Sequence, residues 1–490
     1  MASVVSTLAK PVPMITIRPL RVGLFGIGLD AYWPQFPNLK ARLEGHLLRV
    51  QQKISRDDVE CVNAGLIDNS NRSYAAGRFF RERDVDLIFL YAATYALSST
   101  VLPVVRRAKV PVIILNLAPA AAIDFASFNR LADRVQMTGE WLAYCTACSV
   151  PEIANVFRRA GIQFHQVTGM LDDDPECWRE VDDWIEAARV ASRMAENRLG
   201  LMGHYYGGML DIYSDLTLQS AVFGTHFEMI EVDELSALRR TVSAHEAQVM
   251  LGEFASIFDI QSDCAQADLL EAARTSVALE RLVEAHRLGS FAYYYKGSGM
   301  SENVDTIASI ILGTSLLTAK GVPVAGEYEV KNVQAMKIMD LFGVGGSFTE
   351  YYAMDFAQDV VLMGHDGPAH LAIGERKCKV RPLKVYHGKV GGGVSVEMTV
   401  KHGPVTLLSV IEREGGKLAL LCAEAISVSG PILEIGNTNS RYRFSCGARE
   451  FVNRWNSQSP AHHCSVGVGH IGAKIAKLGQ LLGLEVIQIR

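Results

Sequence analysis

The sequence predicts an α/β protein in which two doubly wound parallel-sheet domains are followed by a C-terminal antiparallel β-domain. Up to residue 195, short apolar runs alternate with stretches of helical spacing, and a second block repeats this alternation. After about residue 345, short strands separated by glycine- and proline-rich turns dominate. Because 490 residues exceed the size of a single hydrophobic core, we expect domains over 1–195, 196–345 and 346–490.

The first domain begins with a short strand at 21–26 that ends in glycine. Leucine and valine at helical spacing predict a helix over 38–54, and a second helix is expected to end at Arg107. Continuous apolar runs are typical of strands buried on both faces of a parallel sheet. Such runs predict the remaining strands of this domain, at 59–64, 86–91 and 110–115.

The second domain is predicted to place a candidate residue, Glu327, at the carboxyl end of a strand, where open α/β sheets bind ligands. Its other strands are expected at 198–203, 227–232 and 290–295, and its helices at 267–286 and 304–319. In the third domain, a helix over 471–481 is expected before the last strand. The preceding strands are expected at 379–385, 394–400, 405–411, 417–422 and 432–435.

Charge and hydropathy exclude several classes of protein. The net charge is −5 and no Lys/Arg block is longer than a pair, so a nucleic-acid partner is not expected. No run of about 18 uncharged apolar residues predicts a membrane span, and the first 13 residues lack the apolar centre of a secretory signal. We therefore expect a cytoplasmic protein without a membrane partner.

Nine cysteines spread over a long chain favour reduced thiols over a disulfide framework. Cys145 and Cys148 form a CxxC pair without the second pair that a zinc site needs.

Two glycine patterns resemble nucleotide-binding motifs. Residues 26–31 read GxGxxA, but Pro34 and Pro37 obstruct the helix that should hold a pyrophosphate. Residues 467–472 read GxGxxG too close to the chain end for a complete βαβ unit. A close-packed turn explains the second pattern better, and a dehydrogenase is disfavoured.

Four residues point to chemistry: Glu327, Glu350, His365 and His463. Each is expected where a strand or helix gives way to a glycine-rich or polar turn. Two carboxylates and two imidazoles suit a divalent ion such as Mn²⁺, Co²⁺ or Fe²⁺, beside which a carboxylate can move protons at carbon. Taken alone, His365 also fits a structural histidine and Glu350 a helix-terminal carboxylate, so a metal site requires that the four converge.

Segments 325–331, 345–352 and 460–463 resemble the metal-site segments of the L-arabinose isomerase family, within the wider L-fucose/L-arabinose isomerase group. The order of the domains fits too, so the resemblance covers nearly the whole chain. It implies that Glu327, Glu350, His365 and His463 coordinate Mn²⁺ and that both glutamates form the acid/base pair. The implied activity is isomerisation of a pentose or hexose aldose to a ketose through a cis-enediol. A homo-oligomer, trimeric or hexameric, is also implied.

The resemblance also suggests substrate contacts. Met209 aligns with a substrate-facing methionine of the family, and we expect His204, Tyr206 and His462 as further contacts. Residues 26–33 depart from the loop that follows the first strand in L-arabinose isomerases, so the sugar recognised is left open. In the third domain, the polar and turn-prone segment 437–443 can hydrogen-bond a sugar or carboxylate, or form interface salt bridges.

Two alternatives remain beside the isomerase. A metal-assisted epimerase of a sugar or sugar acid would use the same enolisation and return the proton to the other face. A non-catalytic sugar-binding protein of the same fold has no need of a proton-transfer pair, so the two glutamates argue against it.

Overall fold

The computed structural model describes residues 18–131, 133–297, 301–384 and 392–490. Within these ranges the chain divides into two compact units, which meet in sequence between Ser192 and Arg193. The fold class is the expected one: parallel sheets with helices, followed by a largely antiparallel C-terminal sheet. The division into three domains stays a prediction.

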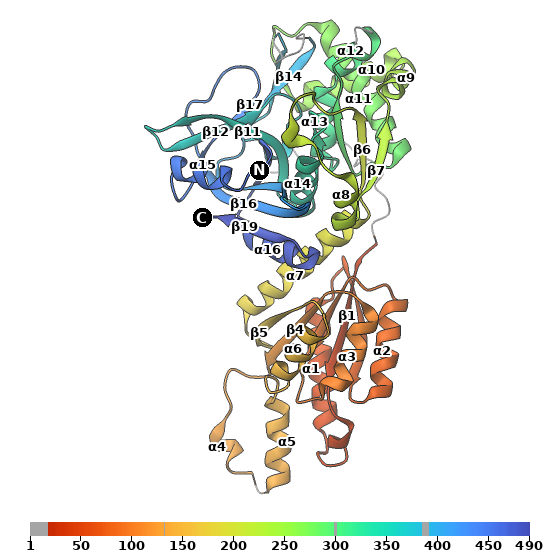
Figure 1. The fold of residues 1–490 in the computed structure, drawn as a ribbon, viewed down its shortest axis with the longest axis vertical. Coiled ribbons are helices and arrows are strands. Elements are labelled where there is room, and N and C mark those ends of the chain that lie inside the picture. The colour runs from red at the N-terminus through yellow and green to blue at the C-terminus, as the bar shows by residue number, and fades with distance from the viewer. Residues whose placement is uncertain (1–17, 132, 298–300, 385–391) are drawn as a thin grey trace. The chain divides into compact units, whose positions relative to one another are not determined.

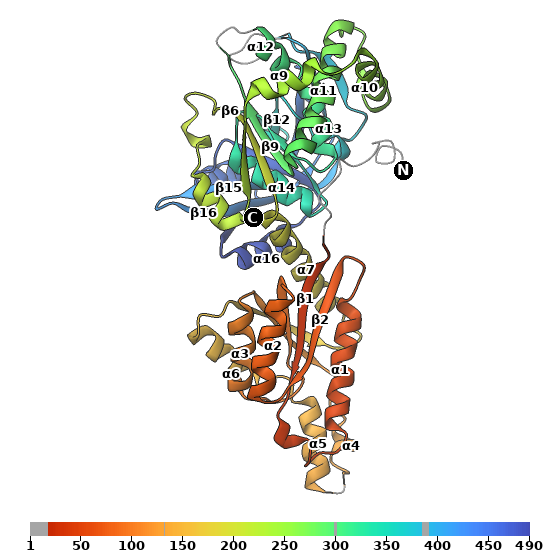
Figure 2. The same cartoon turned by 90° about the vertical axis from the view of Figure 1, so that its right-hand side faces the viewer.

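The first unit is a doubly wound parallel sheet with the strand order β2-β1-β3-β4-β5. Helices α1 and α7 cover one face, and α2, α3 and α6 cover the other (Figure 2). The strands are β1 (Leu20–Ile27), β2 (Val59–Ile67), β3 (Leu87–Tyr91), β4 (Val112–Ala118) and β5 (Phe164–Met170). The helices are η1 (Asp30–Tyr32), α1 (Leu39–Ile54), α2 (Ser70–Glu82), α3 (Ser98–Ala108), α4 (Phe125–Phe128), α5 (Arg134–Tyr144), α6 (Val150–Arg159) and α7 (Pro175–Ala195).

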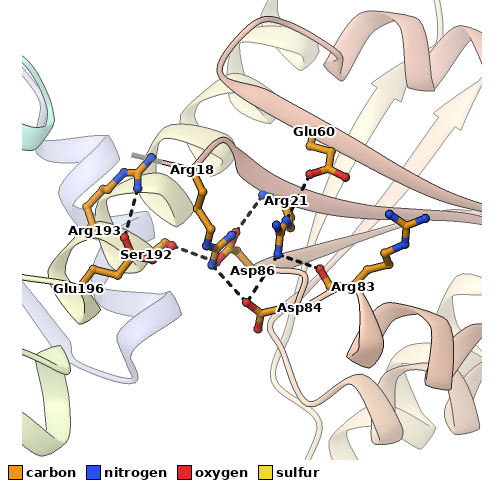
Figure 3. A network of polar contacts seen from close by, with 9 residues as sticks. All are labelled: Arg18, Arg21, Glu60, Arg83, Asp84, Asp86, Ser192, Arg193 and Glu196. Carbon is orange, nitrogen blue, oxygen red and sulfur yellow. Dashed lines mark hydrogen bonds and ion pairs between the residues drawn. The ribbon is translucent and has the colours of Figure 1, made fainter. Parts of the chain in front are cut away.

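One half-buried carboxylate ties three segments of this unit together. Asp86, which directly precedes β3, accepts two hydrogen bonds from the Arg18 guanidinium at 2.7 and 2.8 Å (Figure 3). It also accepts the backbone N–H of Arg21 and the hydroxyl of Ser192, each at 2.9 Å. Asp86 therefore joins the start of β1, the start of β3 and the end of α7.

The second unit contains a parallel sheet with the order β10-β9-β6-β7. Alternate strand residues enter two apolar clusters: Met202 and Phe291 pack with α9 to α13, whereas Leu201 and Ala292 pack with α14. The strands are β6 (Arg198–Gly203), β7 (His226–Ile230), β9 (Ser290–Tyr294) and β10 (Val324–Ala325). The helices are η2 (Leu210–Ile212), α8 (Leu216–Phe223), α9 (Val232–Arg240), α10 (Ala244–Ile257), α11 (Gln266–His286), α12 (Ser301–Ala308), α13 (Ile311–Ala319) and α14 (Val330–Leu341). The single helix expected over 304–319 is wrong, because α12 ends before α13 begins.

The same unit ends in a closed barrel. Its strands follow the order β15-β18-β11-β12-β17-β16, and pairing between β15 and β16 closes the ring (Figure 1). β19 adds to β16 in parallel, and a small sheet has the order β14-β13-β8. The strands are β8 (Asp259–Ile260), β11 (Gly345–Asp355), β12 (Val360–His365), β13 (Lys379–Pro382), β14 (Val394–Glu397), β15 (Gly403–Arg413), β16 (Lys417–Ser427), β17 (Thr438–Arg443), β18 (His463–Val468) and β19 (Glu485–Ile489). The helices are η3 (Leu371–Ile373), α15 (Ala448–Asn456) and α16 (Gly472–Leu482).

Two expectations for the barrel are wrong. Residues 432–435 form no strand, whereas the segment expected as a polar turn, 437–443, contains β17. Arg441 of β17 is 3% exposed and donates to the Pro431 carbonyl and to Gln358. β17 pairs with β12 along its length, so strand pairing in the barrel overrides the local turn propensity.

Helix α14 connects the parallel sheet to the barrel. It packs against β9 and β10 on one side and against β11, β15 and β18 on the other (Figure 1). Its buried residues include Lys331 and Lys337, and each ammonium binds backbone carbonyls. The helix begins at Val330, directly after Glu329 and three residues after Glu327, so the packing of α14 helps to position both carboxylates.

Other sequence features have simple structural counterparts. Cys145 and Cys148 are joined in a disulfide, unlike the reduced pair expected, and the other seven cysteines are free. Gly467, which begins the GxGxxG pattern, lies inside β18 and not in the turn expected, and a Cβ on it would lie 2.8 Å from Val344 Cγ2. Across the described ranges, each helix is too short or too polar to cross a membrane.

Candidate metal centre

Three adjacent barrel strands bring Glu350, His365 and His463 together. β11 lies between β18 and β12, and Glu350 of β11 is opposite His463 on one side and Gly364 on the other. His365 follows Gly364 and ends β12. Side chains opposite each other in antiparallel strands have Cβ atoms about 5 Å apart. Glu350 therefore lies inside a strand, and the expectation that it sits at the end of an element is wrong.

Glu327 reaches the same place from the turn between β10 and α14. Glu327 and Tyr328 have φ values of 58° and 63°, in the left-handed region. Left-handed non-glycine residues cost on the order of 1 kcal/mol each and persist where the surroundings hold them. Here the Tyr328 N–H donates to the Tyr293 carbonyl at 3.0 Å, and the Glu329 N–H donates to the Gly326 carbonyl at 3.1 Å. The turn holds Glu327 in a strained conformation, as is common at functional sites.

The predicted ligands converge around His463. Two groups of donor atoms, Glu327 with His462 and His463, and Glu350 with His365 and His463, each lie within 4.8 Å of one another. His463 Nε2 lies 3.4 Å from Glu327 Oε2. The ring centroids of His365 and His463 are 5.0 Å apart. The structure thus brings all four residues predicted from the sequence to one place.

Phe348 forms an apolar floor beneath the two imidazoles. Its ring centroid lies 4.1 Å from that of His365 and 4.5 Å from that of His463, and its side chain is buried. An apolar floor limits the positions that these rings can adopt and strengthens the electrostatic interactions above it.

The donor set fits a divalent ion. His463 Nε2 is buried and makes no hydrogen bond with the described residues, which is costly unless another group satisfies it. Burial, together with the neighbouring His462, holds the pKa of His463 well below its ordinary value, so its ring is neutral as a metal ligand requires. Carboxylate oxygens with imidazole nitrogens suit Mn²⁺, Co²⁺ or Fe²⁺. The identity of the ion stays a prediction.

A second layer of acceptors orients the imidazoles. His463 Nδ1 lies 3.4 Å from Glu329 Oε2, and His365 Nδ1 lies 2.7 Å from the Asp366 carbonyl oxygen. Histidines that bind metals commonly donate their second nitrogen in this way. Glu329 is fully buried, and burial raises its pKa to about 7. These contacts engage the Nδ1 atom of each ring and so fix the orientation of both imidazoles.

His462 is held from the opposite side by Asp211 of η2. Asp211 Oδ2 lies 2.6 Å from His462 Nδ1 and also accepts the His462 backbone N–H at 2.9 Å. The buried Lys331 ammonium binds the carbonyls of Asp211 and Tyr213 and so holds this loop. His462 Nε2 lies 3.9 Å from Glu327 and 4.0 Å from Glu350. His462 is therefore aimed between the two glutamates.

A cavity of about 160 Å³ opens beside these groups. Three of the predicted substrate contacts, Tyr206, Met209 and His462, line it. His204 does not line it. Its Nδ1 lies 2.8 Å from the Tyr205 carbonyl oxygen, and its ring packs against Tyr294. The remaining lining residues are Glu327, Glu350, Tyr352, His365 and Asp366.

Sequence reasoning missed Asp211, Glu329, Tyr352 and Asp366. The last three lie within two residues of a predicted ligand, so a search of the flanking polar residues would have found them. Asp211 lies two residues from Met209, but its contact with His462 spans 251 positions and has no signal in the sequence.

Comparison with known proteins gives distant relatives. No protein-family model matches the chain. It is 19% identical over 322 residues to the L-arabinose isomerase of Shouchella clausii (strain KSM-K16), covering 64% of this chain and 65% of that protein. It is 23% identical over 331 residues to the L-arabinose isomerase of Shewanella baltica (strain OS223), covering 63% of each. The chain is a distant relative of the L-arabinose isomerases. It spans just under two thirds of the length of the relatives that it matches.

Proposed function

We propose that the protein is a metal-dependent aldose–ketose isomerase that acts on a pentose or hexose. The observation that carries this proposal is the convergence of two carboxylates, Glu327 and Glu350, with three imidazoles beside one small cavity. The distant relationship to L-arabinose isomerases supports the same reaction class.

The two glutamates are the proposed acid/base pair. Isomerisation moves a proton from C2 to C1 of the sugar through a cis-enediol, so one group must take a proton and another must return one. Glu327 and Glu350 each lie within about 4 Å of His462 Nε2, so their carboxylates border the same space. They come from different parts of the fold, the β10–α14 turn and β11, and can thus approach a substrate from two sides.

Glu327, Glu350, His365 and His463 are the proposed ligands of a divalent ion, Mn²⁺, Co²⁺ or Fe²⁺. When bound, such an ion polarises the substrate carbonyl and stabilises negative charge that develops on its oxygens. The chain itself fixes the imidazoles through Glu329 and the Asp366 carbonyl, and supports them on Phe348.

His462 is the proposed hydrogen-bonding partner of a substrate oxygen. Asp211 occupies its Nδ1, so Nε2 points between Glu327 and Glu350 toward the cavity. Met209 and Tyr206 would contact the sugar from the loop that follows β6.

NMR in D₂O tests the proposal. The protein loaded with Mn²⁺ is incubated with a panel of pentoses and hexoses, and the products are examined after the metal is removed. We expect deuterium at C2 of the aldose together with a new ketose. Glu327→Gln and Glu350→Gln should each lower the rate at least 100-fold, because they remove a proton-transfer group.

Glu414→Gln is the matched control, since Glu414 is an exposed residue of the β15–β16 turn. It should leave the rate unchanged, and circular dichroism should show that all variants fold. Deuterium with an inverted C2 and no ketose would replace the isomerase by an epimerase. A Glu327→Gln or Glu350→Gln variant with near-full activity would refute the acid/base assignment.

A further inference from the structure

One wall of the cavity carries a carboxylate that the proposed reaction does not use. Asp366 lines the cavity beside His365, yet its side chain makes no hydrogen bond or ion pair with the described residues. It is half-buried, so it is only partly hydrated. A partly desolvated carboxylate at a binding cavity is an acceptor in need of a donor.

A hydroxyl group lines the same cavity. The Tyr352 hydroxyl oxygen accepts a hydrogen bond from Asn437 Nδ2 at 2.8 Å, so its own proton is directed elsewhere. Asn437 is 2% exposed and also binds the β17 region through its carbonyl, which Asn439 contacts at 3.2 Å. Tyr352 thus lines the same cavity as Asp366 with an O–H that it can donate.

The charges around the cavity are unbalanced. Three carboxylates line it, Glu327, Glu350 and Asp366, and none of its described lining residues is a lysine or arginine. A divalent ion offsets two of these charges, and Asp211 partners His462. One negative charge is therefore left over at Asp366, and it repels a second anion brought into the same space.

We propose that Asp366, together with the Tyr352 hydroxyl, determines the substrate class: it binds hydroxyl or amino groups of a polyol and excludes substrates that carry a phosphate or carboxylate there. This inference rests on the proposed function, because it places a sugar in this cavity. It names the substrate as an uncharged or amino-substituted sugar, and it makes Asp366 a specificity-determining residue.

Binding of unreactive polyols tests this inference without turnover. The probes are a pentitol, the corresponding 1-amino-1-deoxypentitol and the corresponding pentitol 5-phosphate, titrated by calorimetry into the full chain loaded with Mn²⁺. The native protein should bind the amino compound at least 100-fold more tightly than the phosphate. Asp366→Asn should reduce this ratio about tenfold, because the amide carries no charge. Any direct contact of the phosphate with the metal contributes equally in both proteins and cancels in the comparison.

Two further variants complete the test. Asp263→Asn, an exposed aspartate remote in sequence from the centre, should keep the native ratio. Tyr352→Phe should weaken the pentitol several-fold, because it removes one donor without changing the charge. Mn²⁺ affinity, measured by electron paramagnetic resonance, shows that each variant retains the centre.

The outcomes separate the two proposals. An equal ratio in the native protein and in Asp366→Asn, or no binding of the pentitol, would overturn the role of Asp366 even if deuterium exchange establishes an isomerase. A ratio that falls with Asp366→Asn supports the role of Asp366 even if no sugar of the panel is turned over, in which case the isomerase proposal fails alone.

Discussion

Replacing Asp211 by Asn tests whether the geometry around His462 matters for turnover. Asp211 Oδ2 makes two hydrogen bonds with His462, at 2.6 and 2.9 Å. A hydrogen bond to a charged group contributes about 1.5 kcal/mol when shielded from water. The two side chains are 40% and 36% exposed, so solvent screening reduces the contribution of the pair to about 1 kcal/mol. We expect kcat/KM to fall roughly fivefold, since about 1.4 kcal/mol corresponds to a factor of ten.

The pH dependence of stability gives an independent readout. Burial raises the pKa of Asp211, but the hydrogen bonds with His462 outweigh this effect and hold that pKa below 3.8. Ionised Asp211 therefore stabilises the folded protein above pH 3.8, and this stabilisation is lost as pH falls further. Burial lowers the pKa of His462, but Asp211 and the nearby glutamates outweigh this effect and raise that pKa above 6.5. Protonated His462 therefore stabilises the folded protein fully below pH 6.5, and this stabilisation is lost as pH rises. The difference in the free energy of unfolding between the metal-free native protein and Asp211→Asn should therefore be largest between about pH 4 and 6.5.

Urea denaturation at several pH values and steady-state kinetics measure both effects. Asp263→Asn serves as the control for removing an exposed carboxylate. An Asp211→Asn variant with native kcat/KM, or a stability difference that does not shrink at pH 8 and at pH 3, would show that the pair does not position His462.

Three more predictions concern the surroundings of the centre. The pKa of Glu329 is raised by burial from 4.5 to about 7, so ionising it costs the metal-free protein on the order of 3 kcal/mol as pH rises through this range. In Glu329→Gln this loss of stability should disappear from urea denaturation curves. Mn²⁺ affinity should also fall, because an uncharged amide oxygen replaces the carboxylate beside His463 Nδ1. Phe348→Ala should lower the free energy of unfolding by about 3–5 kcal/mol, because it leaves a cavity in the core. It should also weaken Mn²⁺ binding, measured by electron paramagnetic resonance, because the ring packs against the imidazoles. An unchanged Mn²⁺ affinity would show that the ring does not support them. Gly364→Ala would place a Cβ 1.9 Å from the Thr438 carbonyl oxygen of the neighbouring strand, so it should unfold the barrel or lower the melting temperature by at least 10 °C. The control is Gly252→Ala, whose Cβ meets nothing within 4 Å and which should stabilise helix α10 slightly. Equal melting temperatures of the two variants would contradict this packing.

Much of the fold could be predicted because it depends on local patterns. Continuous apolar runs marked strands such as β3 and β4, since strands buried on both faces tolerate few polar residues. The types of ligand could be predicted for a similar reason, because metal binding needs carboxylates and imidazoles whatever the fold. The sequence therefore identified Glu327, Glu350, His365 and His463 as candidates, although it placed Glu350 at the end of an element and not inside β11.

The convergence of these candidates was decided by the tertiary structure alone. Strand register sets Glu350 opposite His463, which is 113 positions away, and pairing of β15 with β16 closes the barrel that holds them. Buried Lys331 holds the loop from which Asp211 reaches His462. β17 is a strand because it pairs with β12 and with β16. Such contacts join residues far apart in the chain, and their free energy depends on packing that no local sequence pattern encodes.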